Sequence, residues 1–428
     1  MSILYSIIFV LFTVYASRHF KKCVLMYAPM KILFHGYIYL IDSSFFITFD
    51  AAITIMLLFF YLKNKKTIVP FPLKVPYLIY GLSCVIYAIY PSVSVGQFQT
   101  ICSELAFTFI FYQVLLTTND LSFTIKYFII IGYVLMINGL IDVVTHFNPI
   151  EEIMKASSGT RYWTSDNNVM RYNFARTKSF LPHAIGMGTV CAILLYLMTF
   201  IYLNDINVKR NNIIFILIVL LLGGVILSNS RTPLIILGVG MIAFLGKQLF
   251  KGYRWIGVFV LGIAFLVLVG GYLQHMVDTV LHSDKVATAG SSSEMREKQL
   301  AIALNYYSKS PIFGMGDKFV ITKLENEHDT WGMESIWLQL IYQRGLIGVA
   351  GSLFLYLGLF WVLRGGKFYK HIFFFILMWL IACTLTSLPG INNGYFLCII
   401  ILIYKVSSNK LNNITLFIYD KPYEQSNA

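Results

Sequence analysis

The sequence predicts an all-α membrane protein that crosses the bilayer about twelve times. Of its 428 residues, 57% are apolar and only 12% are charged, whereas charged residues make up about a quarter of an ordinary soluble domain. The apolar residues gather in long runs, and a helix of about 20 apolar residues is enough to cross a bilayer. Helices are expected because a backbone that faces lipid must satisfy its own hydrogen bonds. The composition excludes a water-soluble enzyme, a disordered chain and a nucleic-acid-binding protein.

Thirteen apolar runs, separated by charged residues or by Gly, Pro and Asn, are candidate spans of one transmembrane domain that covers residues 1–428. The first two runs are the weakest, because Arg18, Lys21, Lys22, Pro29 and Lys31 interrupt them. We therefore expect about twelve true spans. The runs lie near residues 2–17, 24–41, 46–62, 75–90, 97–117, 121–146, 183–203, 211–228, 232–246, 255–273, 340–363, 371–388 and 393–406.

The basic residues predict the orientation of the spans. The short loops at 63–66, 209–210, 247–254 and 364–370 carry Lys and Arg and almost no acids, which is typical of cytoplasmic loops. Alternation then places the tail 407–428 on the cytoplasmic side. Two long loops, 147–182 and 273–334, face outward, together with the short turn Ser228–Arg231.

The second outward loop contains a predicted helix. Ser291 stands three residues before Glu294, which is the spacing of a capping box. From there to about Ser308, Leu300, Ala303, Leu304 and Tyr307 recur at helical spacing and form one apolar stripe, headed by Arg296. We expect an amphipathic helix that lies on the outer membrane surface and ends before Pro311.

Three outward arginines from separate segments are candidate ligands of an anion. Arg176 precedes a span and either anchors the helix end by snorkelling or faces a ligand. Arg296 either pairs with a neighbouring glutamate or points to the bundle. Arg231 occupies a tight outward corner between two apolar helices, where it serves as a headgroup anchor or an anion ligand. Arginine suits a phosphate because its planar fork donates paired hydrogen bonds and keeps its charge. The predicted ligand is a phosphorylated lipid headgroup.

Three further residues are candidates for acid–base chemistry. Glu334 begins an apolar helix and is either a solvated helix start or a general base. His328 lies among carboxylates in the same loop, but the loop has no characteristic metal-ligand spacing, so no metal site is predicted. Glu104 lies within a span, where acids are often functional, or it pairs with a polar neighbour.

Taken in order, these motifs resemble the bacterial O-antigen polymerase and O-antigen ligase superfamily over roughly residues 170 to 350. The stretch SNSRTPLIILG at 228–238 is similar to the family's short arginine turn. The stretch from Arg176 through Pro182 to Gly186 resembles its arginine-led approach to a membrane helix, with Ser179 where a glycine is common. The second loop resembles the family's large periplasmic loop and closing helix in the order of Arg296, Pro311, Gly314, Gly316, Glu334 and the RGLIG stretch at 344–348.

The resemblance implies a metal-independent membrane glycosyltransferase without a cofactor, located in the bacterial inner membrane. Such an enzyme acts at the periplasmic face on oligosaccharides linked to undecaprenyl diphosphate. Arg176, Arg231 and Arg296 would stabilise the leaving diphosphate, and Glu334 or His328 would accept the proton of the acceptor hydroxyl. A polymerase transfers the growing glycan to the next lipid-linked repeat unit, and a ligase transfers it to the lipid A core.

The residue at position 334 favours the polymerase. In ligases a histidine–asparagine pair stands eleven residues before the first glycine of the closing Gly-Leu-x-Gly, whereas this chain has Glu334 and Ser335 there. The alternatives are the ligase, a flippase or exporter of lipid-linked oligosaccharide, and a non-catalytic assembly scaffold. Expected partners are the lipid-linked glycan, the lipid bilayer, a chain-length regulator and a flippase.

Overall fold

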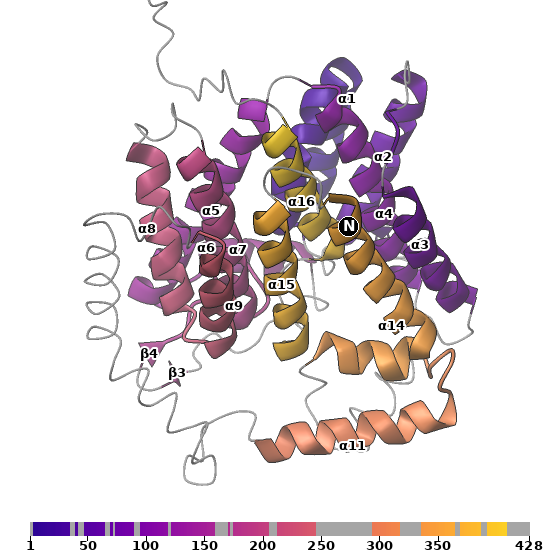
Figure 1. The fold of residues 1–428 in the computed structure, drawn as a ribbon. Coiled ribbons are helices and arrows are strands. Elements are labelled where there is room, and N and C mark those ends of the chain that lie inside the picture. Colours follow the sequence, from indigo (N-terminus) through magenta and orange to yellow (C-terminus); the bar gives the residue numbers. More distant parts are fainter. Residues whose placement is uncertain are drawn as a thin grey trace, which may run out of the picture.

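The computed structural model shows a bundle of apolar helices, with one amphipathic helix lying across one end (Figure 1). It describes residues 3–34, 39–41, 47–64, 69–71, 73–89, 95–118, 121–158, 170–171, 174–204, 212–244, 293–316, 335–363, 369–386 and 392–408.

The described part of the chain is helical apart from two short antiparallel strand pairs, β1 (Tyr39–Ile41) with β2 (Ile47–Thr48) and β3 (Met170–Arg171) with β4 (Phe174–Ala175). Among the described residues, three helices are long and apolar enough to cross a membrane: α5 (Leu121–Thr145), α7 (Ala184–Asn204) and α14 (Ile336–Leu363). The remaining helices are α1 (Ile3–Met30), the 3₁₀ turn η1 (Lys31–Leu33), α2 (Phe49–Asn64), α3 (Lys74–Ile89), α4 (Val95–Leu116), α6 (Pro149–Ser158), α8 (Asn212–Leu227), α9 (Arg231–Ile242), α11 (Ser293–Lys309), α15 (Tyr369–Leu385) and α16 (Asn393–Ser408).

Most of the predicted spans coincide with a helix. The ten from 46–62 to 232–246 and from 340–363 to 393–406 each overlap one, and 255–273 lies outside the described residues. The prediction for 24–41 is wrong. Its first part belongs to α1, which bends at His19, and the helix ends at Met30, one residue after Pro29. The chain then continues through η1 to β1, because proline interrupts the hydrogen bonding of a helix interior.

Helix α7 occupies the core of its part of the bundle. Its side chains are buried almost all round, from Ala184 to Ile201, as expected for a helix that is apolar on every face. Helices α8 and α9 pack against it. Other helices leave large apolar side chains exposed, among them Leu11 of α1, Val219 of α8 and Leu357 of α14. Exposed apolar faces of this kind suit contact with lipid.

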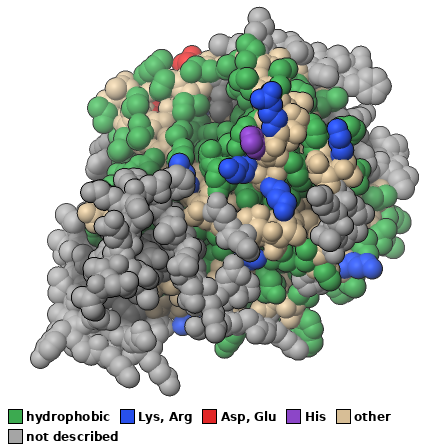
Figure 2. Space-filling view, turned by 90° about the horizontal axis from the view of Figure 1, so that it is seen from above, with side chains coloured by type: hydrophobic (Ala, Val, Ile, Leu, Met, Phe, Trp, Pro, Cys, Tyr) green, Lys and Arg blue, Asp and Glu red, His purple; other side chains and the backbone are tan. Residues whose placement is uncertain are grey.

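One face of the bundle carries basic side chains. Lys and Arg side chains gather among hydrophobic ones on the face seen in Figure 2. Helix α15 begins with Tyr369 and Lys370, and α16 has Lys405 in its last turn. Helix α11 lies at the opposite end of the bundle (Figure 1), which the sequence predicts to be the outward end.

The predicted loop helix exists as α11, and Ala303 is the residue of its predicted apolar stripe that is buried against the bundle. Ala303 and Tyr306 are buried and pack with Tyr342 of α14, whereas Leu300 and Leu304 are exposed. The small side chain of Ala303 and the aromatic ring of Tyr306 pack against Tyr342, so they form the face that contacts α14. The leucines then face away from α14, as an interfacial helix can turn its apolar side to lipid. Ser291 lies outside the described residues.

Candidate functional site

The turn between α8 and α9 is tight, polar and buried. Helix α8 ends at Leu227, and α9 begins at Arg231. Between them, Ser228, Asn229 and Ser230 are almost fully buried. Asn229 has a φ of +48°, in the left-handed region that Asn tolerates better than most residues. Three polar residues between two apolar helices therefore form a corner that directs Arg231 to the end of the bundle.

Arg176 lies against this turn although it is more than 50 residues away in sequence. Its Nε donates to the Ser228 carbonyl oxygen at 3.3 Å, and its Nη2 donates to Ser230 Oγ at 2.7 Å. The next residue adds a backbone bond, from Thr177 N to the Leu227 carbonyl at 3.3 Å. Arg176 and Arg231 are both half-buried. The structure thus brings two of the three predicted arginines to one turn.

Helix α7 holds the turn through a glycine. A Cβ at Gly188 would collide with Ser228 Oγ, and it would lie 2.5 Å from Pro233 Cγ. Real Cβ atoms do not approach other atoms so closely, so a larger residue would displace the turn. Gly188 therefore allows the corner that carries Arg231 to lie directly on the buried core helix.

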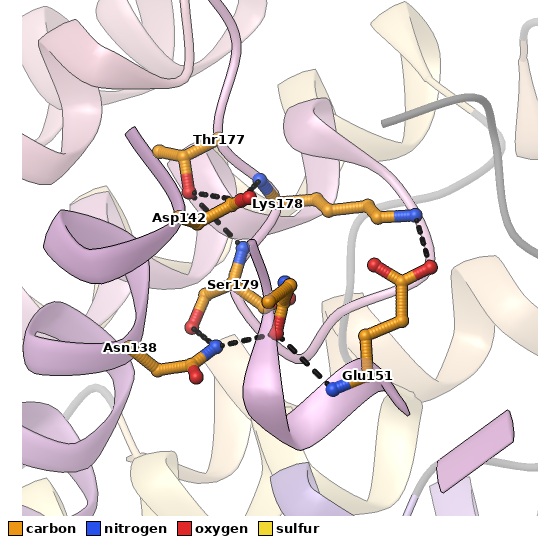
Figure 3. A network of polar contacts seen from close by, with 7 residues as sticks. Asn138, Asp142, Glu151, Thr177, Lys178 and Ser179 are labelled. Carbon is orange, nitrogen blue, oxygen red and sulfur yellow. Dashed lines mark hydrogen bonds and ion pairs between the residues drawn. The ribbon is translucent and has the colours of Figure 1, made fainter. Parts of the chain in front are cut away.

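A network of buried polar side chains fixes the segment that follows Arg176 (Figure 3). Asp142 of α5 accepts hydrogen bonds from Thr177 Oγ1 at 2.8 Å and from Lys178 N at 3.3 Å. Asn138 Nδ2 donates to Ser179 Oγ at 3.2 Å, and Ser179 Oγ donates to the Leu135 carbonyl at 2.8 Å. Because residues 177–179 are tied to α5 through several bonds, the backbone at Arg176 has little freedom.

Lys178 belongs to this network rather than to an anion site. Its Nζ lies 2.9 Å from Glu151 Oε1 of α6, and both side chains are almost completely buried. The positive charge of Lys178 is therefore paired with Glu151 inside the protein. Asn148 caps α6, since its Oδ1 accepts from Glu151 N at 3.1 Å, and its Nδ2 donates to the Ser179 carbonyl.

Ser179 takes a conformation that favours glycine. Its φ is +52°, in the left-handed region where most residues with a Cβ are strained. This accounts for the glycine that is common at this position in the family that the sequence resembles. In this chain the serine side chain compensates with its bonds to Leu135 and Asn138.

His183 lies beside the two basic residues, just before α7. Its Nδ1 accepts a hydrogen bond from Ile185 N at 3.1 Å. Burial, and then the positive charges of Arg176 and Lys178, lower the pKa of His183 to about 4. The imidazole is therefore neutral at pH 7 and adds no positive charge to the turn.

The other predicted site residues are not at this turn in the described structure. Arg296 lies in α11, which packs against α14, and its side chain lies outside the described part of the chain. Glu334 and His328 also lie outside the described residues. Glu104 lies in α4 and is buried. Within the described ranges, no group of three or more His, Cys, Asp or Glu residues has a metal-binding arrangement.

Sequence reasoning missed the residues that hold the arginines in place. Ser228, Ser230 and Asp142 contact Arg176 or its neighbours, and their partners lie too far away along the chain to be paired by spacing. The polar run SNS between two apolar helices and an acid near the end of the span 121–146 were the available signals. Helix α6 was also not predicted within the loop 147–182.

The arrangement can bind an anion. The Arg176 guanidinium bonds to this corner, and Arg231 is the first residue of α9, so the positive end of the helix dipole lies at the same place. Arginine retains its charge at any physiological pH. The geometry is therefore compatible with a phosphate or diphosphate group at this end of the bundle.

Comparison with known proteins adds one family. Residues 216–353 match the family model described as O-antigen ligase, and this segment holds Arg231, Arg296 and the glycines that follow α11. No curated protein matches the chain. This match supports the resemblance of the chain to the O-antigen polymerase and ligase superfamily, whose members are glycosyltransferase-like membrane enzymes acting on lipid-linked glycans.

Proposed function

We propose that this protein polymerises surface-polysaccharide repeat units in the bacterial inner membrane, as a multi-pass enzyme with about twelve spans. It would transfer a growing glycan from undecaprenyl diphosphate to the next lipid-linked repeat unit at the periplasmic face. The observation that carries the proposal is the bonding of Arg176 to Ser228 and Ser230, in the turn that leads into Arg231, within a chain whose residues 216–353 match the family model.

The proposed reaction exchanges one bond for another at the anomeric carbon. The acceptor hydroxyl oxygen forms a bond to that carbon, and the bond from the carbon to the diphosphate oxygen breaks. Undecaprenyl diphosphate leaves with the electron pair, and the proton of the hydroxyl passes to a base, for which Glu334 and His328 are the candidates. Arg176 and Arg231, joined by Arg296, stabilise the charge that develops on the leaving group without a metal ion.

The network around Asp142 supports this role because it limits the reorganisation of Arg176. A guanidinium held by Ser228 and Ser230, on a backbone held by Asp142, is oriented before the substrate arrives. Preorganised charge of this kind stabilises a transition state more than mobile charge does.

A ligase is the second candidate, because the matching family model is described as O-antigen ligase. Both activities use the same donor and the same leaving group, and they differ in the acceptor. The acid at position 334, where ligases carry a histidine, favours the polymerase. The acceptor that the enzyme uses in vitro therefore separates the two.

The test is reconstitution in lipid nanodiscs with lipid-linked repeat units from the protein's own host, in the presence of EDTA. We expect a ladder of longer lipid-linked glycans, and we expect Arg231→Ala and Arg296→Ala to lower its rate by roughly 100-fold or more, by analogy with the loss of a charge-stabilising group elsewhere. Lys298→Ala is the matched control, because Lys298 is exposed on the same helix as Arg296. Product that forms only after lipid A core is added would favour the ligase, and no product with either acceptor would contradict both activities.

A further inference from the structure

A second group of buried polar residues lies in the part of the bundle built from α1 to α4, α14 and α16. Its best-satisfied member is Asp50 at the start of α2. Lys31 Nζ lies 2.6 Å from Asp50 Oδ1, and Tyr27 Oη donates to the same oxygen at 2.7 Å. Ser103 Oγ donates to the other carboxylate oxygen at 3.0 Å. This carboxylate is fully paired.

The carboxylate of Glu104, the residue after Ser103, has no such partner in the described part of the chain. The residue is only 7% exposed, yet no hydrogen bond or ion pair links its carboxylate to another described residue. The charged groups that act on it are Lys31, Asp50 and Arg344. Buried carboxylates in folded proteins are normally hydrogen-bonded, because leaving one without a partner is costly. The missing partner points to a ligand.

Hydrogen-bonded side chains lie near Glu104. Gly394 of α16 packs on Glu104, and a Cβ at Gly394 would lie 3.1–3.3 Å from the Glu104 atoms Cα, Cβ and Cγ. The preceding residue, Asn393, donates to Tyr80 Oη at 3.1 Å and accepts from Tyr356 Oη at 2.6 Å. Asn393 is half-buried at the first position of α16, so the group reaches the outward end of the bundle.

Arg344, a third residue near Glu104, lies at a bend in α14 that backbone hydrogen bonds fix. At Gly345 the helix has a φ of +58° and changes direction. The segment Pro311–Gly316, which we call the clasp, bonds to this bend through its backbone. Met315 N donates to the Tyr342 carbonyl at 2.7 Å, and Leu346 N donates to the Pro311 carbonyl at 2.9 Å.

The contact between the clasp and α14 requires a glycine in each segment, Gly314 in the clasp and Gly345 in the helix. A Cβ at Gly345 would lie 2.5 Å from the backbone of Ile312, and a Cβ at Gly314 would lie 2.5 Å from Arg344 N. Backbone in this conformation persists only where the surroundings fix it, and such positions often serve a function. Here the result is that Arg344 is held at the bend, with its side chain over Gly348 and its charge acting on Glu104 and Tyr80.

We propose that Glu104, Arg344 and Asn393 form the binding site for the acceptor glycan, in which the Glu104 carboxylate accepts a hydrogen bond from a sugar hydroxyl. An anion is disfavoured because it would face Glu104, and a cation is disfavoured because it would face Arg344 and Lys31. A neutral ligand rich in hydroxyl groups matches a carboxylate, a guanidinium and an amide at once. Naming this glycan as the acceptor rests on the proposed function.

The probe is the free oligosaccharide repeat unit, released from its lipid diphosphate and titrated calorimetrically into the protein in nanodiscs. We expect Glu104→Gln to weaken binding by roughly tenfold or more, because the amide does not reproduce the hydrogen bond between the carboxyl group and the sugar hydroxyl. We expect Arg231→Ala to leave the affinity unchanged, because the free glycan carries no diphosphate. Glu152→Gln is the matched control, since Glu152 is an exposed acid on α6.

Gly394→Ala is a second variant that leaves the charge unchanged but crowds Glu104, and we expect it to weaken binding as well. Each variant is first checked for an unchanged elution volume and thermal transition. No binding by the wild type, or equal affinity in Glu104→Gln and wild type, would overturn the inference, even if the polymer ladder forms. Glutamate-dependent binding without any ladder would support the glycan site while contradicting the proposed polymerase.

Discussion

The two buried polar regions of the bundle differ in how completely their charges are paired. Around Arg176, the carboxylates of Asp142 and Glu151 each have a partner, in Thr177 and Lys178. Around Arg344, Asp50 has three donors, whereas Glu104 has none among the described residues. Paired charges hold neighbouring groups in place, and a buried carboxyl group without a hydrogen-bond partner is poised for a ligand. We therefore assign positioning to the first region and binding of an uncharged ligand to the second.

The largest effect is expected from breaking the paired region at Lys178. Lys178→Met leaves Glu151 buried without its counter-charge, and we expect the free energy of unfolding to fall by about 3–5 kcal/mol. Chemical denaturation in detergent micelles measures the change. The double variant Lys178→Met with Glu151→Leu should recover most of the loss, because it removes both charges. If the double variant is no more stable than the single one, the ion pair is not the source of the effect.

A smaller loss of stability is expected when a larger residue on α7 crowds the turn Ser228–Arg231. Gly188→Ala places a methyl group against Ser228 and Pro233, and overpacking of this kind costs about 1–3 kcal/mol. The polymerisation rate should fall as well, because the turn carries Arg231. Gly223→Ala is the control, since a Cβ at Gly223 meets nothing within 4 Å. Equal rates in the two variants would show that the position of the turn does not matter to activity.

Lowering the pH should destabilise the folded protein through His183, because its imidazole binds a proton less readily in the folded protein than in the unfolded chain. Its pKa in the folded protein, about 4, lies below its ordinary value of 6.5, so the unfolded chain takes up a proton first. The contribution of neutral His183 to stability is therefore complete above pH 6.5 and is lost as the pH falls towards 4. His183→Asn keeps an acceptor for Ile185 N but does not titrate. Thermal unfolding between pH 7 and pH 4 should show a shallower decline in this variant, and parallel curves would contradict the assignment.

The smallest effect is expected at Ser179. Ser179→Gly relieves the left-handed backbone but loses the bonds to Leu135 and Asn138, so we expect a net change in stability of about 1 kcal/mol or less. Ser179→Ala loses the same bonds and keeps the strain, and it should be the less stable of the two variants. The reverse order, measured by thermal unfolding, would mean that the positive φ carries no strain.

The sequence predicted those elements that depend on short-range patterns along the chain. The spans from α2 onwards follow from apolar runs, and α11 follows from helical spacing and Pro311. The residues of α11 that contact α14 were not predicted, because Ala303 and Tyr306 pack against Tyr342, a residue far along the chain. The contact of Arg176 with Ser230 was also not predictable from the sequence, since it joins segments that lie far apart along the chain. The partner of Lys178 was also not predictable, because Glu151 lies on a helix that no pattern indicated.

The central claim is that Arg176 and Arg231 bind the diphosphate of the donor lipid. The most direct measurement is the affinity of the purified protein in nanodiscs for undecaprenyl diphosphate itself, with and without EDTA. The account predicts that Arg231→Ala and Arg176→Ala each weaken binding by roughly tenfold or more, that EDTA has no effect, and that Glu104→Gln binds like the wild type. Equal affinity of the arginine variants and the wild type would contradict it.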